Sequence, residues 1–114
     1  MSPIGLELRE YIDQQGRSRF AAWFDTLEAT AAAKVSASLL RLEQGNISNV
    51  ESVGGGVFEL KIHFGPGYRV YFGRDGTRLV ILLGGGTKKR HSRDISVTKE
   101  LWADYRARRK GRES

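Results

Sequence analysis

Three apolar segments in the second half of the chain constrain the fold most strongly. Apolar and polar side chains alternate over residues 58–64 and again over 68–72, and residues 79–83 are apolar without interruption. Alternation is typical of strands with one buried face, whereas a short apolar run is typical of a strand covered on both faces. The turn-forming sequences Gly65–Gly67 and Asp75–Gly76 separate the segments. The pattern therefore predicts three strands joined by short turns.

The first half of the chain predicts one more strand and two helices. Residues 4–11 alternate in the manner of a short strand. Ser18 is placed to cap a helix whose apolar residues recur at helical spacing from Phe20 to Leu27. A second helix is expected over about residues 30–44, with Ala32, Val35, Leu39 and Leu42 as its buried stripe and Gly45–Asn46 as its end.

The rest of the chain completes the predicted architecture. Residues 46–56 are rich in Asn, Ser and Gly and predict a loop, and Gly84–Gly86 are expected to end the third strand. A last helix is expected over about residues 94–109, with a basic tail over about 106–114 that frays. The order β-α-α-β-β-β-α predicts a single α+β domain over residues 1–114. Its small, mostly antiparallel sheet would carry the two N-terminal helices on one face, with a C-terminal helix in addition.

Charge is distributed unevenly along the chain. The 114 residues contain 19 Lys and Arg against 13 Asp and Glu, a net charge of +6. Residues 1–51 carry a net −2, and residues 52–114 carry a net +8. Positive charge concentrated in one part of a small domain attracts phosphate polymers. The charge asymmetry therefore favours nucleic-acid contact, and a role in solubility is the alternative.

Composition excludes several other classes of protein. The chain has no cysteine, so neither disulfides nor thiolate metal sites are available. No apolar run approaches the roughly 20 residues of a membrane-spanning helix, and the N-terminus lacks the features of a signal peptide. Two histidines and scattered carboxylates show no metal-ligand spacing, and the glycine triplets lack the context of nucleotide-binding loops. We expect a soluble cytoplasmic protein without a metal, a cofactor or a membrane partner.

The predicted strands direct a set of polar side chains to the face opposite the helices. Side chains alternate across a strand, so residues two apart share a face. The basic segment after the third strand adds to this set. Together they form the predicted cationic surface, which comprises Lys61, His63, Arg69, Tyr71, Lys88, Lys89, Arg90, His91 and Arg93.

Such a surface has the groups needed to cleave RNA through its 2′-hydroxyl. The reaction requires a base, cations that offset charge on the phosphorane, and an acid for the departing 5′-oxygen. Arg69 has a planar fork that bonds two phosphate oxygens. The base or acid is a lysine crowded by other cations, or a histidine, either His63 or His91. Tyr71 is suited to stack on a base or to orient the 2′-hydroxyl.

Each of these side chains also has a purely structural interpretation. Lys61 and Arg69 form a cross-strand charge pattern with Glu59, the one carboxylate predicted on the same strand as Lys61. Glu59 is therefore expected to pair with Arg69 or a nearby lysine. His63 is a lone histidine on an exposed strand face, where most histidines are inert.

Two segments carry a resemblance to a known family. Residues 57–72, with the sequence Gly-Tyr-Arg-Val-Tyr at Gly67–Tyr71, and residues 80–89, with Gly-Thr-Lys-Lys at Gly86–Lys89, resemble the RelE/ParE superfamily of type II toxins. The chain is most similar to the HigB-like branch of addiction-module killer proteins, over essentially its whole length. The resemblance implies a RelE-like fold and a toxin that cleaves mRNA, usually on the ribosome. It also implies a cognate helix-turn-helix antitoxin. Operator DNA would then be bound only by the complex of toxin and antitoxin.

The resemblance also assigns roles to individual residues. Arg69 matches the phosphate-stabilising arginine, Lys61 matches a strand lysine, and Lys88 and Lys89 match the basic pair after the last strand. We therefore expect two groups of site residues. The catalytic group comprises Lys61, Arg69, Lys88, Lys89 and His91, and the RNA-binding group comprises His63, Tyr71, Arg90 and Arg93. The chain departs from RelE-type sequences at Glu59, where those carry a basic residue, and Tyr105 lies too far along the last helix to match their C-terminal tyrosine.

Two other functions remain open from the sequence. The ParE branch shares the fold and inhibits a protein, DNA gyrase, so an inhibitor of a protein target is one alternative. A relic without activity, which only binds its antitoxin and operator DNA, is the other. The convergent cations Lys61, Arg69, Lys88 and Lys89 favour RNA chemistry, and Glu59 argues against it.

Overall fold

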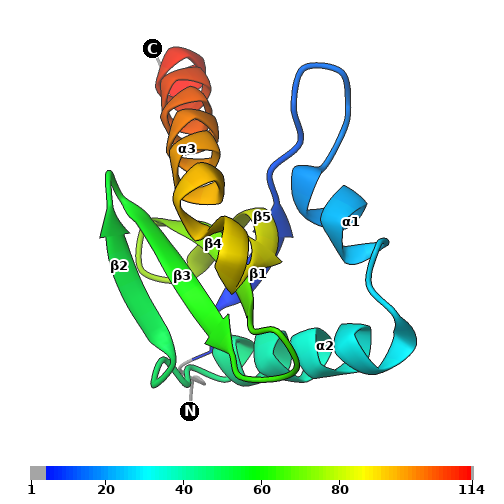
Figure 1. Ribbon diagram of the computed structural model, residues 1–114. Helices are drawn as coiled ribbons and strands as arrows, with labels where there is room; N and C mark the ends of the chain where they lie inside the picture. The colour runs from blue at the N-terminus through cyan, green and yellow to red at the C-terminus, as the bar shows by residue number, and fades with distance from the viewer. Residues whose placement is uncertain (1–4, 114) are drawn as a thin grey trace.

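A computed structural model describes residues 5–113, of which residues 112 and 113 are described by their backbone alone. Its elements follow one another along the chain as Figure 1 shows. They are β1 (Glu7–Glu10), α1 (Arg19–Phe24), α2 (Ala29–Glu43), β2 (Val50–Gly54), β3 (Val57–Ile62), β4 (Tyr68–Asp75), β5 (Leu79–Thr87), the 3-10 helix η1 (Lys88–Arg90) and α3 (His91–Glu113). The predicted α+β class, with a mostly antiparallel sheet and a C-terminal helix, is confirmed.

The strands form one sheet in the order β1-β5-β4-β3-β2. β1 is parallel to β5, and the other neighbouring pairs are antiparallel. In the hairpin of β3 and β4, Lys61 lies opposite Arg69 and Glu59 lies opposite Tyr71. Arg69 also lies opposite Gly86 of β5. This register brings Lys61 of β3 and Arg69 of β4 to the end of the sheet where β5 leads into η1.

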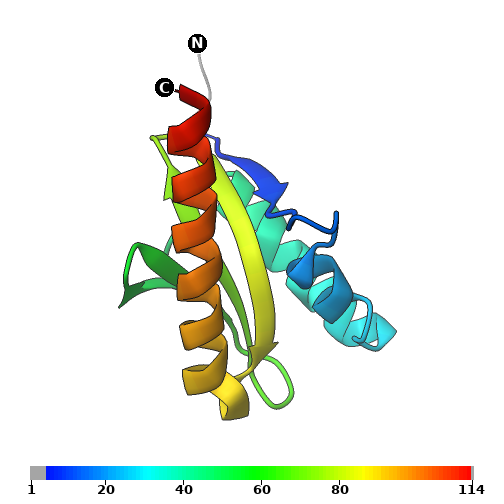
Figure 2. The ribbon, with the colours of Figure 1, turned by 90° about the horizontal axis from the view of Figure 1, so that it is seen from above.

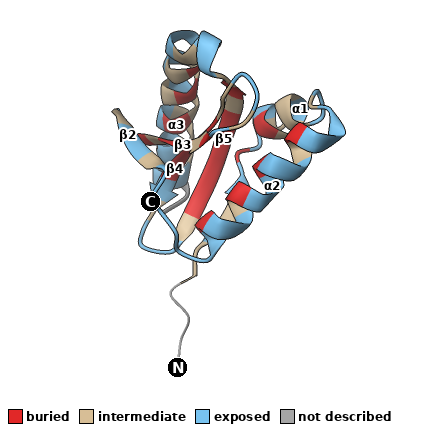
Figure 3. Cartoon of the chain, turned by 60° about the horizontal axis from the view of Figure 1, so that its bottom comes forward, coloured by how far each residue is buried: buried red, intermediate tan, exposed pale blue. Residues whose placement is uncertain are grey.

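Helices cover both faces of the sheet, so the molecule has three layers (Figure 2). α1 and α2 pack on one face through a core built around Phe20, Val35, Leu60, Val70 and Val80. Figure 3 shows that the buried residues of α2 form a line toward the sheet. This line comprises Ala31, Val35, Ser38 and Leu42, so the predicted Ala32 and Leu39 are displaced to its half-buried margin.

The second core lies between the sheet and α3. It contains Tyr11, Tyr71, Ile81, Leu83 and Trp102 among its buried residues. The predicted inner side of the last helix is confirmed, because it packs on this core through Ile95, Thr98, Leu101, Trp102 and Tyr105. As a consequence, α3 covers the sheet face that the cationic surface was expected to leave open.

Side-chain caps explain where the first two helices begin. Ser18 Oγ accepts a hydrogen bond of 3.0 Å from the N–H of Ala21, as predicted for the start of α1. Glu28 Oε1 accepts one of 2.7 Å from the N–H of Ala31 at the start of α2. α1 ends at Phe24, earlier than predicted, although Leu27 still packs against the first core.

Three predicted boundaries are wrong. The loop expected over 46–56 contains β2, an edge strand whose backbone pairs with β3 although its side chains are largely exposed. Gly84–Gly86 continue β5 instead of ending it, since β4 pairs with them throughout. The tail expected to fray from residue 106 is helical, because α3 runs from His91 to Glu113.

The first strand is shorter than predicted. The strand expected over 4–11 is observed at Glu7–Glu10, and residue 4 lies outside the described residues. Within residues 5–113, no helix is both long enough and apolar enough to cross a bilayer.

Candidate functional site

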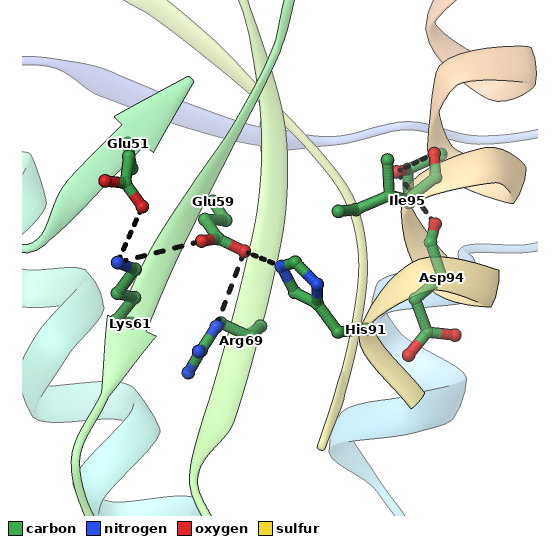
Figure 4. A network of polar contacts seen from close by, with 8 residues as sticks. Glu51, Glu59, Lys61, Arg69, His91, Asp94 and Ile95 are labelled. Atoms are coloured by element: carbon green, nitrogen blue, oxygen red, sulfur yellow. Dashed lines mark hydrogen bonds and ion pairs between the residues drawn. The ribbon is translucent and has the colours of Figure 1, made fainter. Parts of the chain in front are cut away.

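A buried carboxylate, Glu59, forms the centre of a polar cluster near the start of α3 (Figure 4). Glu59 is 3% exposed. Its Oε1 lies 2.7 Å from His91 Nε2 and 3.4 Å from Arg69 Nε. Its Oε2 lies 4.0 Å from Lys61 Nζ. The predicted pairing of Glu59 with Arg69 or a nearby lysine is confirmed, since Glu59 pairs with Arg69 and with Lys61. We call Glu59, Lys61, Arg69 and His91 the Glu59 cluster.

Lys61 lies at the outer side of this cluster, between two carboxylates. Its Nζ is 2.6 Å from Glu51 Oε1, and Glu51 belongs to the edge strand β2. The hydrogen bond and charge of Lys61 lower the pKa of the exposed Glu51 carboxyl. The ammonium is thus held by both β2 and β3, which limits its freedom to reach a substrate.

Arg69 and Tyr71 are buried, so the prediction that they lie on an exposed face is wrong. Arg69 is 9% exposed and Tyr71 has no exposed surface, because α3 covers this part of the sheet. Burial raises the pKa of the Tyr71 phenol, and the nearby charges of Asp94 and Glu59 act in the same direction. Without surface, Tyr71 has no means of stacking on RNA in this conformation, and we leave it out of the proposed site.

The segment Lys88–Arg93, which we call the basic turn, comprises η1 and the first residues of α3. Lys88, Lys89, Arg90 and Arg93 are exposed, and none forms an ion pair with a described residue. The basic segment after β5 forms the helical turn η1 and the start of α3. The N–H of Lys88 donates a hydrogen bond of 3.0 Å to the carbonyl of Gly67, which joins the basic turn to the β3–β4 turn.

That junction creates a shallow hollow that links the two groups of cations. His63, Arg69 and Lys88 line it, together with the turn residues between β3 and β4. His63 is exposed, as predicted, but β3 ends at Ile62, so His63 lies just beyond the strand and not on its face. The structure thus brings Arg69 into both the Glu59 cluster and the surface hollow. Lys89, Arg90 and Arg93 lie farther along the basic turn and do not line this hollow.

The arrangement has chemistry suited to a phosphate ester. An imidazole held by a carboxylate transfers protons near neutral pH, and the carboxylate offsets the charge that the imidazole gains. Guanidinium and ammonium groups offset the charge of a phosphorane. In the described residues, no three His, Asp or Glu side chains are grouped as a metal ion would require. The groups available here are therefore imidazole, carboxylate and fixed cations.

One buried residue of this region was missed in the sequence. Asp94 is 5% exposed, and its Oδ2 has no hydrogen-bond partner. It lies directly over Gly86, where an added Cβ would collide with the carboxylate. The available signal was its spacing, because Asp94 follows His91 by three residues on one helix and such residues are neighbours.

Comparison with known proteins places the chain in a family. A family model described as "Phage derived protein Gp49-like" matches residues 22–101, which include the Glu59 cluster and the basic turn. The chain is also similar to a protein of Haemophilus influenzae (strain ATCC 51907 / DSM 11121 / KW20 / Rd) that is named only as uncharacterized. The two are 43% identical over 83 residues, which is 72% of this chain and 84% of that protein. The chain therefore belongs to the Gp49-like family of phage-derived proteins, a family related to the RelE- and HigB-like toxins.

Proposed function

We propose that the chain is the toxin of a type II toxin–antitoxin module, of the HigB-like branch, and that it cleaves mRNA on the ribosome without a metal. One observation supports this most directly: His91 lies 2.7 Å from a buried carboxylate and shares that carboxylate with Arg69. A proton-transfer group next to a phosphate-binding fork is the combination that cleavage through the 2′-hydroxyl needs. The family relationship adds independent support.

In the proposed reaction His91 acts as the base. Glu59 accepts a hydrogen bond from Nε2–H, an assignment of the tautomer that leaves Nδ1 to accept a proton. Nδ1 takes the proton of the 2′-hydroxyl as the 2′-oxygen bonds to phosphorus. The bond from phosphorus to the 5′-oxygen breaks, and this oxygen takes a proton from an acid. The products are a 2′,3′-cyclic phosphate and a 5′-hydroxyl.

The cations divide into two groups in this proposal. Arg69 directs Nε toward Glu59, so its other N–H groups are available to the hollow and to a phosphate. Lys88 and Lys89 offset charge on the phosphorane, and one of them supplies the proton for the 5′-oxygen. Arg90, Arg93 and His63 hold the neighbouring RNA. Lys61 fixes Glu59 and Glu51 and acts on the substrate indirectly.

The proposal includes partners of the same module. A cognate helix-turn-helix antitoxin would neutralise the toxin by covering the basic turn with acidic and apolar residues. Operator DNA would be bound only by the complex of the two proteins. The site of action would be the cytoplasm, where translating ribosomes are found, and no cofactor would be needed.

Cleavage is tested by adding the purified chain to a reconstituted translation reaction. We expect fragments with 5′-hydroxyl and 2′,3′-cyclic phosphate ends, unaffected by EDTA, and no cleavage where the 2′-hydroxyl is replaced by hydrogen. His91→Gln should remove most of this activity, and Arg106→Gln, which removes an exposed cation distant from the cluster, should retain it. Intact mRNA with every preparation would contradict the proposal.

The alternative functions have distinct outcomes in the same setting. Burial of Arg69 against Glu59 is the observation that favours them, because a neutralised guanidinium binds phosphate less strongly. An inhibitor of DNA gyrase would arrest growth with intact mRNA and damaged or relaxed DNA. A relic would cause no arrest at all and would still bind its antitoxin.

A further inference from the structure

A second hollow lies between α1, the end of β5 and the first turn of α3. It has a volume of about 450 Å³, and its lining combines aromatic, cationic and acidic side chains with bare backbone. The residues that carry the argument are Trp23, Arg19, Arg90 and Asp94, together with Gly85 and Gly86. We call this the Asp94 hollow. Figure 4 shows Asp94 in the first turns of α3, adjacent to His91 of the Glu59 cluster.

Two glycines of β5 form the floor of this hollow and allow Trp23 and Asp94 to pack directly against the backbone. A Cβ at Gly85 would collide with the Trp23 ring, and one at Gly86 would collide with the Asp94 carboxylate. β1 pairs with β5 only as far as Leu82, so beyond that residue this edge of β5 has no strand beside it in the described chain. Alternate residues of Gly84–Thr87 therefore direct their N–H and C=O groups away from β4 and toward this side.

Asp94 is the feature that points to a ligand. The residue is 5% exposed, and its Oδ2 accepts no hydrogen bond from the described chain. A carboxylate in the first turn of a helix gains from the helix dipole, but the dipole supplies no direct hydrogen bond. A buried carboxylate oxygen without a donor is costly, and proteins seldom retain one without a use. A molecule in the hollow that carries a hydrogen-bond donor would satisfy the Asp94 carboxylate.

We propose that the Asp94 hollow binds a guanine base of the RNA, an inference that rests on the proposed RNA substrate. Guanine presents two adjacent donors, N1–H and the 2-amino group, which match the two oxygens of a carboxylate. Adenine and cytosine present one amino donor beside a ring nitrogen that repels the carboxylate. Uracil presents one N–H between two carbonyl oxygens. An acceptor-only side chain therefore selects guanine.

The other walls suit a nucleotide as a whole. Trp23 is half-buried and presents an aromatic ring, on which bases of single-stranded RNA stack. Arg19 and Arg90 are exposed and have no ion-pair partner in the described chain, so they are available to the flanking phosphates. Asp94 and His91 are neighbours on α3. A guanine held by Asp94 therefore positions the RNA backbone beside His91, the proposed general base. The hollow would thereby set which phosphate is cleaved.

Nucleotide binding to the wild-type chain gives the first test. The chain has two tryptophans, so its 15N-labelled form has two indole N–H signals, which the Trp23→Phe variant assigns. We expect GMP to shift the Trp23 signal and to leave that of Trp102 in place. IMP, which lacks the 2-amino group, should bind about tenfold more weakly, as should AMP and UMP. An equal response to all four nucleotides, or none, would overturn the inference and leave Asp94 bonded to an ordered water.

A matched pair of variants gives the second test. Asp94→Asn keeps the shape and replaces one acceptor by a donor, so the preference for GMP over IMP should disappear. Glu100→Gln removes the same charge from an exposed position on the same helix, and the preference should remain. Preference retained by Asp94→Asn would overturn the assignment. If this variant does not fold, the comparison of GMP with IMP on the wild-type chain still decides.

Mapping of cleaved mRNA ends separates this inference from the proposed function. We expect the RNA ends produced by the wild-type chain to lie at a fixed distance from a guanine. The ends produced by Asp94→Asn should show no fixed distance from guanine. Cleavage without guanine preference, together with no GMP binding, would overturn the hollow and leave the ribonuclease intact. Specific GMP binding at Trp23 without cleavage would support the hollow and contradict the proposed catalysis.

Discussion

Two buried carboxylates lie at opposite ends of α3, and their surroundings differ. At the far end, Asp75 accepts a hydrogen bond of 2.6 Å from the Tyr105 hydroxyl and pairs with Arg109 at 2.7 Å. Near the first residue of α3, Glu59 Oε1 lies 2.7 Å from His91 Nε2 and 3.4 Å from Arg69 Nε. Four buried side-chain polar atoms lack a hydrogen-bond partner in the described chain. Three of them, Arg69 Nε, Tyr71 Oη and Asp94 Oδ2, lie near Glu59, and the fourth, Arg108 Nε at the far end, is 3.0 Å from the Asp104 carboxylate.

This difference separates a structural contact from a functional one. The Asp75 carboxylate is paired with Tyr105 and Arg109 and fixes the helix on the sheet, beside the stacked rings of Trp102 and Tyr105. The Glu59 end retains unpaired buried groups, which cost stability and persist where a site requires them. Four predictions test this contrast, from the largest expected effect to the smallest.

The largest effect is expected at Arg69. Arg69→Ala removes a cation that acts on the phosphorane, and a loss of about 3 kcal/mol would slow cleavage roughly a hundredfold. Arg69→Lys should also be impaired, because lysine lacks the two-pronged fork. Single-turnover cleavage at saturating substrate is the measurement. Arg74→Ala, an exposed position on the same strand, is the control. Full activity of folded Arg69→Ala would exclude the residue from the site.

The next effect compares the two carboxylates directly. Glu59→Gln should slow cleavage by about tenfold or more, since His91 and Arg69 lose the carboxylate that positions them. Asp75→Asn should leave the cleavage rate unchanged and lower the free energy of unfolding by about 1–3 kcal/mol, because Tyr105 and Arg109 lose their charged acceptor. Cleavage kinetics and urea unfolding of both variants test the contrast. Equal effects on cleavage would remove the distinction between the two ends.

A smaller effect separates fixed cations from those that only attract RNA. Lys89→Ala should depress the cleavage step at saturating substrate with little change in its salt dependence. Lys110→Ala, in the last turns of α3, should weaken binding modestly and flatten the salt dependence by about one unit of slope, because the variant neutralises one phosphate fewer. Cleavage at several salt concentrations distinguishes the two. A change of salt slope alone in both variants would make the basic turn a binding surface only.

The smallest effect concerns the stability of the buried phenol. Tyr71→Phe removes a hydroxyl without a hydrogen-bond partner in the described chain, so the free energy of unfolding should rise by about 1 kcal/mol. The raised pKa of Tyr71 means that its contribution to stability is complete below about pH 10 and declines as the pH rises further, where the unfolded chain ionises first. Between about pH 8 and pH 10.5, the variant should lose less stability than the wild type in urea unfolding. Tyr105→Phe, which lacks the bond to Asp75, should be destabilised instead.

Local sequence patterns determined much of this architecture. Alternation over β3 and β4, the helical spacing of the apolar residues and the cap at Ser18 depend on neighbours within a few residues, so the chain itself carries the signal. The inner side of α3 and the pairing of Glu59 with Arg69 followed from the same periodicities.

Tertiary structure decided what local patterns do not contain. β2 exists because β3 offers its edge, and Gly84–Gly86 remain extended because β4 pairs with them. Arg69 and Tyr71 are buried because a helix distant in sequence covers their face, and strand alternation specifies a face without specifying what lies over it. The same docking of α3 brings His91 to Glu59 and Asp94 to Gly86. The chemistry of the site therefore depends on how the last helix packs, a long-range outcome that no short stretch of the sequence encodes.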